Sequence, residues 1–153
     1  MIRQFKNFLF GKLSGNATEY YDGTGNFSTP SVSASQVYKV GVTIDGGGSA
    51  ITTGVKGYTS IPVTGTITKV RLLADQNGNA VMDIWKDTFA NYPPTVADTI
   101  TAAAKPTLAA ADSYEDTTLT GWTTAVTAGD VLGFNVDSAG TITRLTLELE
   151  ITP

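Results

Sequence analysis

The strongest constraint on the fold is a strict alternation of apolar and polar residues near the end of the chain. In the run TITRLTLELEIT, residues 141–152, a leucine or isoleucine occupies every second position from 145 to 151, and the positions between them carry charged or hydroxyl side chains. Successive side chains of a β-strand point to opposite faces of its sheet. The run therefore predicts a strand with one buried and one solvated face, which requires a second apolar layer to pack against.

Shorter runs with the same period recur along the chain, separated by turn residues. They predict strands at residues 36–45, 55–63, 66–74, 80–86, 114–119 and 132–137. The Ala-rich stretch 99–113 contains Pro106 and several β-branched residues, so we expect it to be a crossing loop rather than a helix. Together these patterns predict one all-β domain at residues 36–153, a jelly-roll-like antiparallel β-sandwich.

The stretch DQNGNAVMDIWKDTFANYPPT, residues 75–95, has two competing interpretations. Its acidic and amide residues begin like a calcium loop, but Ala80 and Lys86 stand where that loop requires glycine and glutamate. The step Asn77-Gly78 is instead typical of a two-residue hairpin turn, which needs positive φ at both central residues. We therefore expect a hairpin that leads into the strand at 80–86.

The composition excludes whole classes of chemistry. The chain of 153 residues contains neither cysteine nor histidine, which removes thiolate nucleophiles, imidazole acid-base catalysis and the usual zinc ligand sets. Its formal net charge of −4 provides no basic field to attract a nucleic-acid backbone. We therefore expect a protein without catalytic activity, without a cofactor and without a nucleic-acid partner.

The N-terminus differs from the rest of the chain. In MIRQFKNFLFGKL, residues 1–13, apolar residues recur at helical spacing among basic ones, and the first acidic residue is Glu19. The run is too short to span a membrane and lacks the features of a secretory signal. It predicts a segment that docks into a partner protein, with an interfacial amphipathic helix or a locally packed terminus as alternatives. The candidate anchoring residues are Ile2, Arg3, Phe5, Lys6, Phe8 and Leu9.

A connector separates this segment from the strands. Residues 14–35 are rich in glycine, serine, threonine and asparagine, a composition typical of an extended linker. The sequence thus predicts an N-terminal anchor and connector at residues 1–35, followed by the sandwich domain.

Three aromatic residues are candidates for a ligand or subunit contact. Trp85 is expected on the face of its strand away from the core, and Phe89 and Tyr92 follow in the next loop. Exposed rings stack on sugars, pack between subunits or cover a small second core. The sequence alone leaves these alternatives open.

Two carboxylates also share one face of a strand. Glu148 and Glu150 point the same way from the last strand, as the paired acids of a glycoside hydrolase must. We expect Arg144, together with Lys69 or Arg71, to neutralise them across neighbouring strands, which makes catalytic use the weakest of the functional interpretations.

Several sequence blocks carry a resemblance to a known family. They include GVKGY, DIWKD, FANYPPT, AGDVL and FNVDSA, and the region from 49 to 151 that contains them closely resembles a domain at the C-terminal end of tail-fibre and other virion surface proteins of tailed bacteriophages. The resemblance implies a β-sandwich, commonly packed as a homotrimer, that presents a surface outward from a particle. It implies no catalytic residues.

The expectation that follows is a non-enzymatic structural protein at the virion surface. As a fibre or decoration protein, it would bind capsid or tail proteins through its N-terminus and expose a trimeric β-sandwich for host-surface adhesion, including attachment to a glycan, or for particle decoration. Whether it attaches to the head or the tail stays open. The alternative is a free carbohydrate-binding module that uses Trp85, Phe89 and Tyr92, and the third class is a glycoside hydrolase that uses Glu148 and Glu150.

Overall fold

A computed structural model describes residues 20–21, 27–28 and 36–153 of the chain. The chain divides into two units, Met1–Ala34 and Ser35–Pro153, and each is described by itself. In the first unit, β1 (Tyr20–Tyr21) and β2 (Phe27–Ser28) pair antiparallel, a short pairing inside the segment expected to be an extended connector. The candidate anchoring residues between positions 2 and 9 lie outside the described residues.

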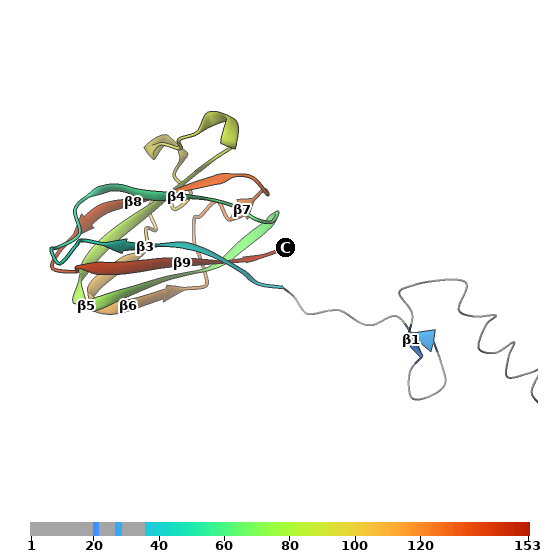
Figure 1. Ribbon diagram of the computed structural model, residues 1–153, viewed down its shortest axis with the longest axis horizontal. Helices are drawn as coiled ribbons and strands as arrows, with labels where there is room; N and C mark the ends of the chain where they lie inside the picture. Colours follow the sequence, from blue (N-terminus) through green and yellow to red (C-terminus); the bar gives the residue numbers. More distant parts are fainter. Residues whose placement is uncertain (1–19, 22–26, 29–35) are drawn as a thin grey trace, which may run out of the picture. The chain divides into compact units, whose positions relative to one another are not determined.

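The second unit is built from antiparallel strands and two short 3-10 turns. In chain order these are β3 (Tyr38–Asp45), β4 (Gly54–Ser60), β5 (Gly65–Asp87), η1 (Phe89–Asn91), η2 (Val96–Asp98), β6 (Thr107–Asp116), β7 (Ala125–Val126), β8 (Val131–Ala139) and β9 (Arg144–Thr152) (Figure 1). In the part of the chain that the structure describes, no helix has the length and hydropathy to cross a bilayer.

The long strands β5 and β6 each belong to two layers, and this sets the topology. The first half of β5 lies between β9 and the end of β6, and β3 pairs with the far edge of β9. The second half of β5 lies between β8 and the beginning of β6, and β4 pairs with the far edge of β8. The layers β3-β9-β5-β6 and β4-β8-β5-β6 have the strand order of a jelly roll, so the predicted all-β sandwich is confirmed (Figure 1).

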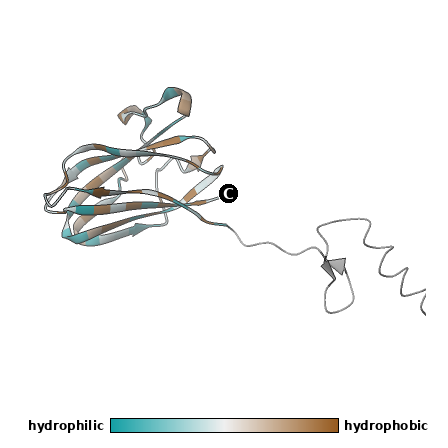
Figure 2. Cartoon of the chain, viewed as in Figure 1, coloured by the Kyte–Doolittle hydropathy of each residue, from teal (hydrophilic) through white to brown (hydrophobic). Residues whose placement is uncertain are grey.

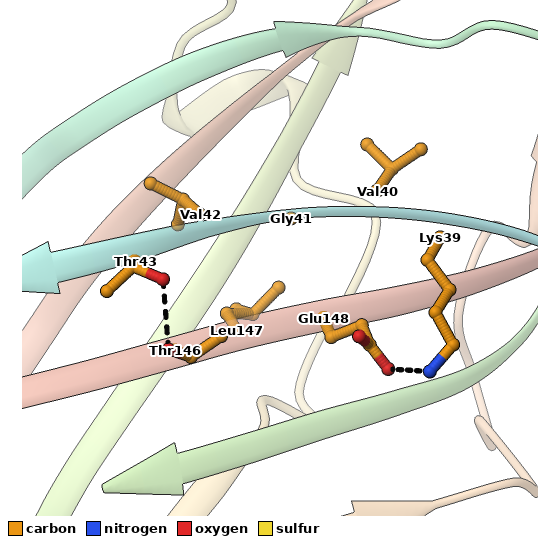
Figure 3. A pocket seen from close by; sticks show the side chains of 8 residues that line it. All are labelled: Lys39, Val40, Gly41, Val42, Thr43, Thr146, Leu147 and Glu148. Carbon is orange, nitrogen blue, oxygen red and sulfur yellow. Dashed lines mark hydrogen bonds and ion pairs between the residues drawn. The ribbon is translucent and has the colours of Figure 1, made fainter. Parts of the chain in front are cut away.

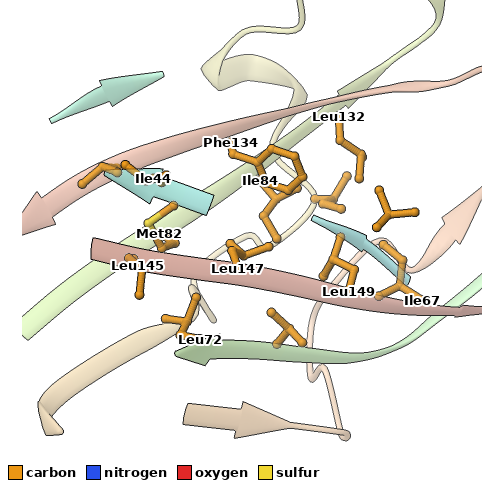
Figure 4. Close-up of a cluster of buried hydrophobic side chains, with 14 of the residues drawn as sticks. Ile44, Ile67, Leu72, Met82, Ile84, Leu132, Phe134, Leu145, Leu147 and Leu149 are labelled. Atoms are coloured by element: carbon orange, nitrogen blue, oxygen red, sulfur yellow. The ribbon is translucent and has the colours of Figure 1, made fainter. Parts of the chain in front are cut away.

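The space between the layers is filled by the apolar side chains that the alternation predicts. Leu145, Leu147 and Leu149 of β9 are fully buried, and they face Leu132 and Phe134 of β8 across the core (Figure 4). Burying one such side chain contributes about 1.5–3 kcal/mol of hydrophobic free energy. In Figure 2 the same alternation shows as brown and teal segments that follow each other along the strands.

The hairpin predicted at Asn77-Gly78 is wrong. β5 runs through this step without reversing, and neither residue has a positive φ. The strand instead passes here from one layer to the other: its pairing with β9 ends at Ala74 and its pairing with β8 begins at Ala80. Glycine at position 78 allows the side chain of Ile142 to pack closely against the β5 backbone and does not form a turn. A Cβ at this position would lie 2.7 Å from Cγ1 of Ile142.

The polar side chains beside this step fasten β5 to its neighbours. The carboxylate of Asp75 accepts hydrogen bonds from the hydroxyl and backbone N–H of Thr143 and from the N–H of Arg144, and these bonds, the hydroxyl's first, lower the pKa of Asp75. Gln76 donates to a carbonyl of the same β8–β9 loop, and Asn79 accepts an N–H from β6. No group of three or more acidic, histidine or cysteine side chains is placed to hold a metal ion among the described residues.

The Ala-rich stretch is only in part the expected crossing loop. Strand β6 begins at Thr107 instead of 114, because Leu108 is buried and pairs beside Ala80 of β5. Alanine has a low β-propensity, so the local composition does not indicate this strand, which tertiary pairing imposes. Strand β4, in contrast, is shorter than predicted, because it ends at Ser60 and not at Val63.

Candidate functional site

The segment between β5 and β6, residues 88–106, rises from the sandwich as an excursion beside β4 and β8 (Figure 1). It carries two of the three aromatic residues singled out from the sequence. Brown stretches mark apolar residues on it in Figure 2. The excursion therefore presents exposed apolar side chains of the kind that form contact surfaces.

The base of the excursion is tied to the sandwich by one buried carboxylate. Oδ1 of Asp83 accepts hydrogen bonds from the hydroxyls of Thr99 at 2.6 Å and Thr101 at 2.7 Å and from the N–H of Ile84 at 2.8 Å. Oδ2 lies 3.0 Å from Nζ of Lys105. The Asp83 side chain is 1% exposed, so the returning chain at 99–105 wraps the carboxylate completely.

This enclosure decides the charge state of Asp83. Burial alone would raise its pKa, but the hydrogen bonds of Thr99 and Thr101, the nearby indole of Trp85 and the ammonium of Lys105 together lower the pKa below its ordinary value. The carboxylate is thus held as an anion inside a polar cage. The buried indole nitrogen of Trp85 itself has no well-aligned hydrogen-bond partner among the described residues.

The excursion docks on the outer face of the β4-β8-β5 layer. The strand register places Tyr58, Gly133 and Trp85 in one row across β4, β8 and β5. Gly133 has no side chain, and Pro94 of the excursion packs into the space: a Cβ on Gly133 would lie 3.3 Å from Pro94 Cγ and 3.2 Å from Tyr58 Cε1. Since Pro94 is buried, this contact fixes the excursion against the sheet.

Next to this contact lies a shallow groove of about 490 Å³ with aromatic walls. The rings of Tyr58 and Tyr92 meet edge to face, with centroids 5.0 Å apart and planes at 70°. Phe89, 76% exposed, stands at the same groove, and Tyr92 and Tyr58 are half exposed. The groove is lined by Tyr58, Thr59, Ser60, Phe89, Tyr92 and Val131.

Short-range hydrogen bonds hold the aromatic turn in shape. Oδ1 of Asp87 accepts the backbone N–H of Thr88 and the amide of Asn91, and these bonds lower the pKa of Asp87. Farther along the chain, after Tyr92, Thr95 and Asp98 form a capping box around η2. The rings are therefore presented by a structured turn.

The groove is apolar and hydroxyl-bearing, and its surroundings are acidic. None of its lining residues carries a charge. In the strand register Asp87 of β5 pairs with Val131 of the groove, and Lys86 is 3.2 Å from the carboxylate of Asp130. The electrostatic field near the groove thus favours a neutral partner over an anionic one.

The opposite layer carries the two glutamates considered for catalysis. Glu148 lies 2.8 Å from Nζ of Lys39, and Glu150 lies 3.3 Å from Nζ of Lys69. Arg71 is within 3.5 Å of both carboxylates. The expected cross-strand neutralisation by Lys69 and Arg71 is confirmed, and both acids belong to a network of ion pairs on a partly exposed face.

Arg144 takes no part in that network. Its guanidinium lies 2.9 Å from Asp45 at the end of β3, so the expectation that it neutralises the two glutamates is wrong. A hollow of about 220 Å³ at the edge of the network is lined by residues of β3 and β9, among them the ion pair of Lys39 with Glu148 (Figure 3). Gly41 is constrained, because a Cβ there would collide with the carbonyl oxygen of Leu147.

The structure brings together only part of the aromatic set that the sequence suggested. Phe89 and Tyr92 share the groove, whereas Trp85 is half buried on β5, across Gly133 from Tyr58 and near the Asp83 carboxylate. The residue that sequence reasoning missed is Tyr58. Tyr58 lies within the strand predicted at residues 55–63, but nothing in its local sequence indicates that Tyr92 would reach it.

Comparisons with known proteins do not assign this chain to a family. No protein-family model and no curated protein matches the sequence. A structure of the complex of Aeromonas sobria serine protease with the chaperone ORF2 is 9% identical over 88% of this chain and 33% of that one, with a TM-score of 0.31. A structure of infectious bursal disease virus, Gx strain, is 14% identical over 78% and 35%, with a TM-score of 0.22. This chain spans about a third of either one, and neither likeness is close enough to support an argument.

Proposed function

We propose that this chain is a non-enzymatic surface protein of a tailed-bacteriophage particle, a fibre or decoration protein anchored by its N-terminus. Its jelly roll, assembled as a homotrimer, would serve host-surface adhesion or particle decoration. The proposal rests on the sequence resemblance of residues 49–151, which includes the blocks that form β4, the second half of β5, the aromatic turn and β8. Jelly rolls recur in viral capsid proteins and lectins, although a fold by itself does not assign a function.

The single observation that favours adhesion is the groove beside Tyr58, Phe89 and Tyr92. Its rings are held at the surface by a structured turn, and they are not needed to fill the core between the layers. Exposed, positioned rings are typical of contact surfaces. In a trimer, three weak copies of such a surface act together, because binding of the first copy raises the effective concentration of the others.

The anchor is tested by deletion of residues 1–13. Particles are assembled in the presence of either the full chain or residues 14–153, purified by density gradient and blotted for the chain. We expect the truncated chain to be absent from particles while its thermal unfolding matches that of the full chain. Normal incorporation of residues 14–153 would refute the anchoring role.

The same groove favours one second candidate, a free carbohydrate-binding module that never joins a particle. The two candidates share the surface and differ in the N-terminus. If the full chain binds a saccharide but does not co-purify with particles, the module is the better description. A glycoside hydrolase that uses Glu148 and Glu150 is the third candidate. If the chain hydrolyses an oligosaccharide and Glu148→Gln does so at the same rate, these two glutamates are not its catalytic acids.

A further inference from the structure

The groove offers the chemistry that a sugar ring requires. A pyranose has an apolar face of C–H groups and a rim of hydroxyls, so it needs a flat aromatic surface beside polar groups. Tyr58 and Tyr92 meet at 70° and form a corner of two such surfaces, with Phe89 at the same groove. The hydroxyl-bearing residues Thr59 and Ser60 line the groove with them.

The charges around the groove select among saccharides. Sulfated, phosphorylated and sialylated sugars bind most strongly where a cation or several N–H donors face their negative group. The lining residues have none, Lys86 is paired with Asp130, and Asp87 lies next to Val131 in the strand register. An anionic sugar would therefore meet an uncharged wall beside a carboxylate, whereas a neutral sugar meets no such repulsion.

The size of the groove argues against a second copy of the chain as its occupant. A stable protein interface takes roughly 20–30 residues from each side. The groove has six lining residues and about 490 Å³ of open volume, which suits a small ligand or the end of a glycan chain. Its rings are also placed in advance by the Asp87 and Thr95–Asp98 hydrogen bonds, so little ordering is needed on binding.

We propose that the groove formed by Tyr58, Phe89 and Tyr92 is a binding site for neutral saccharides, in which one sugar ring stacks on the tyrosine corner. This inference rests on the adhesive role proposed above and deepens it. Trp85, the third ring of the sequence-based set, stands outside the site.

The test begins with the purified full chain, biotinylated and assembled on streptavidin, applied to an array of neutral, sialylated and sulfated oligosaccharides. The neutral oligosaccharide that binds most strongly is then titrated by calorimetry into the unmodified chain and into four variants. Phe89→Ala and Tyr92→Ala remove rings that contribute little to the core, Tyr92→Phe keeps the ring, and Leu73→Ala removes a comparably exposed apolar side chain, 52% exposed, from the opposite layer.

We expect binding to neutral sugars, weakened about tenfold or more in Phe89→Ala and Tyr92→Ala and retained in Tyr92→Phe and Leu73→Ala. The absence of any neutral binder, a preference for anionic sugars, or equal affinity in all four variants would each overturn the site. Light scattering measures the oligomeric state of the same variants. If the unmodified chain is an oligomer and Phe89→Ala and Tyr92→Ala are monomers, the groove is a subunit interface and the proposal is wrong. The deletion of residues 1–13 reports on the particle role separately, since it leaves the groove intact.

Discussion

Replacement of Asp83 by asparagine should destabilise the domain far more than an ordinary charge removal. Asparagine keeps an oxygen for Thr99 and Thr101, but it loses the negative charge that faces Lys105 at 3.0 Å. Removing one partner of a buried ion pair costs about 3–5 kcal/mol. Lys105 is 29% exposed and also pairs with Asp137 at 2.6 Å, so the lower end of that range applies. A loss of about 3 kcal/mol corresponds to a decrease in Tm of roughly 10 °C for a domain of this size.

Urea unfolding followed by tryptophan fluorescence measures this loss. The matched control is Asp137→Asn, which removes the more exposed partner of the same lysine and should cost no more than about 1 kcal/mol. Hydrogen exchange of the amides at 99–105 should accelerate in Asp83→Asn and not in the control. A loss below about 1 kcal/mol in Asp83→Asn would refute the reasoning that the carboxylate ties the excursion to the sandwich.

The same variant has a predicted pH signature. The pKa of Asp83 is lowered on folding, so its contribution to stability is present above the unfolded pKa and is lost as pH falls through the folded pKa. Asp83→Asn should therefore show a shallower loss of stability on acidification than the unmodified chain. Some acid dependence should remain, because hydrogen bonds also lower the pKa of other carboxyl groups. These are Asp45 through the N–H of Gly47, Asp75 through Thr143, Asp87 through the N–H of Thr88 and Glu115 through Arg71.

Three further substitutions test other parts of the account. Gly78→Ala should cost about 1–3 kcal/mol in urea unfolding through its clash with Cγ1 of Ile142, and the same substitution should cost less in an Ile142→Ala background, which lacks that atom, whereas full tolerance of alanine would contradict the packing at this step. Leu147→Ala should cost about 2–5 kcal/mol, and a smaller loss would place β9 outside the core. Glu148→Gln should change stability by less than about 1 kcal/mol, because its ion pairs are partly exposed, and a larger change would indicate a buried role.

The parts of the fold that could be predicted from the sequence are those encoded by local alternation. β8 and β9 repeat apolar residues at every second position, so their inward faces follow from the period alone. The continuity of β5 could not be predicted in this way. Asn77-Gly78 has the local preference of a turn, but the pairing of β5 with β9 before it and with β8 after it overrides that preference.

The candidate site shows the same division between local and long-range information. Phe89 and Tyr92 lie close together in the sequence, so their joint exposure could be anticipated. Tyr58 joins them only through the docking of the excursion over Gly133, a contact between distant parts of the chain. Asp83 stands two positions before Trp85, so strand alternation places it on the same outer face, and its burial by the chain at 99–105 has no signal in its own neighbourhood.

The most direct test of the proposed function is the rate at which particles assembled with this chain adsorb to the proposed host cells. Particles bearing the Phe89→Ala/Tyr92→Ala chain are compared with particles bearing Leu73→Ala, at equal amounts of chain per particle measured by blotting. The account predicts adsorption slowed by about tenfold or more in the groove variant only, because weakening each of several linked contacts multiplies their effects. Equal adsorption of the two kinds of particle would contradict it.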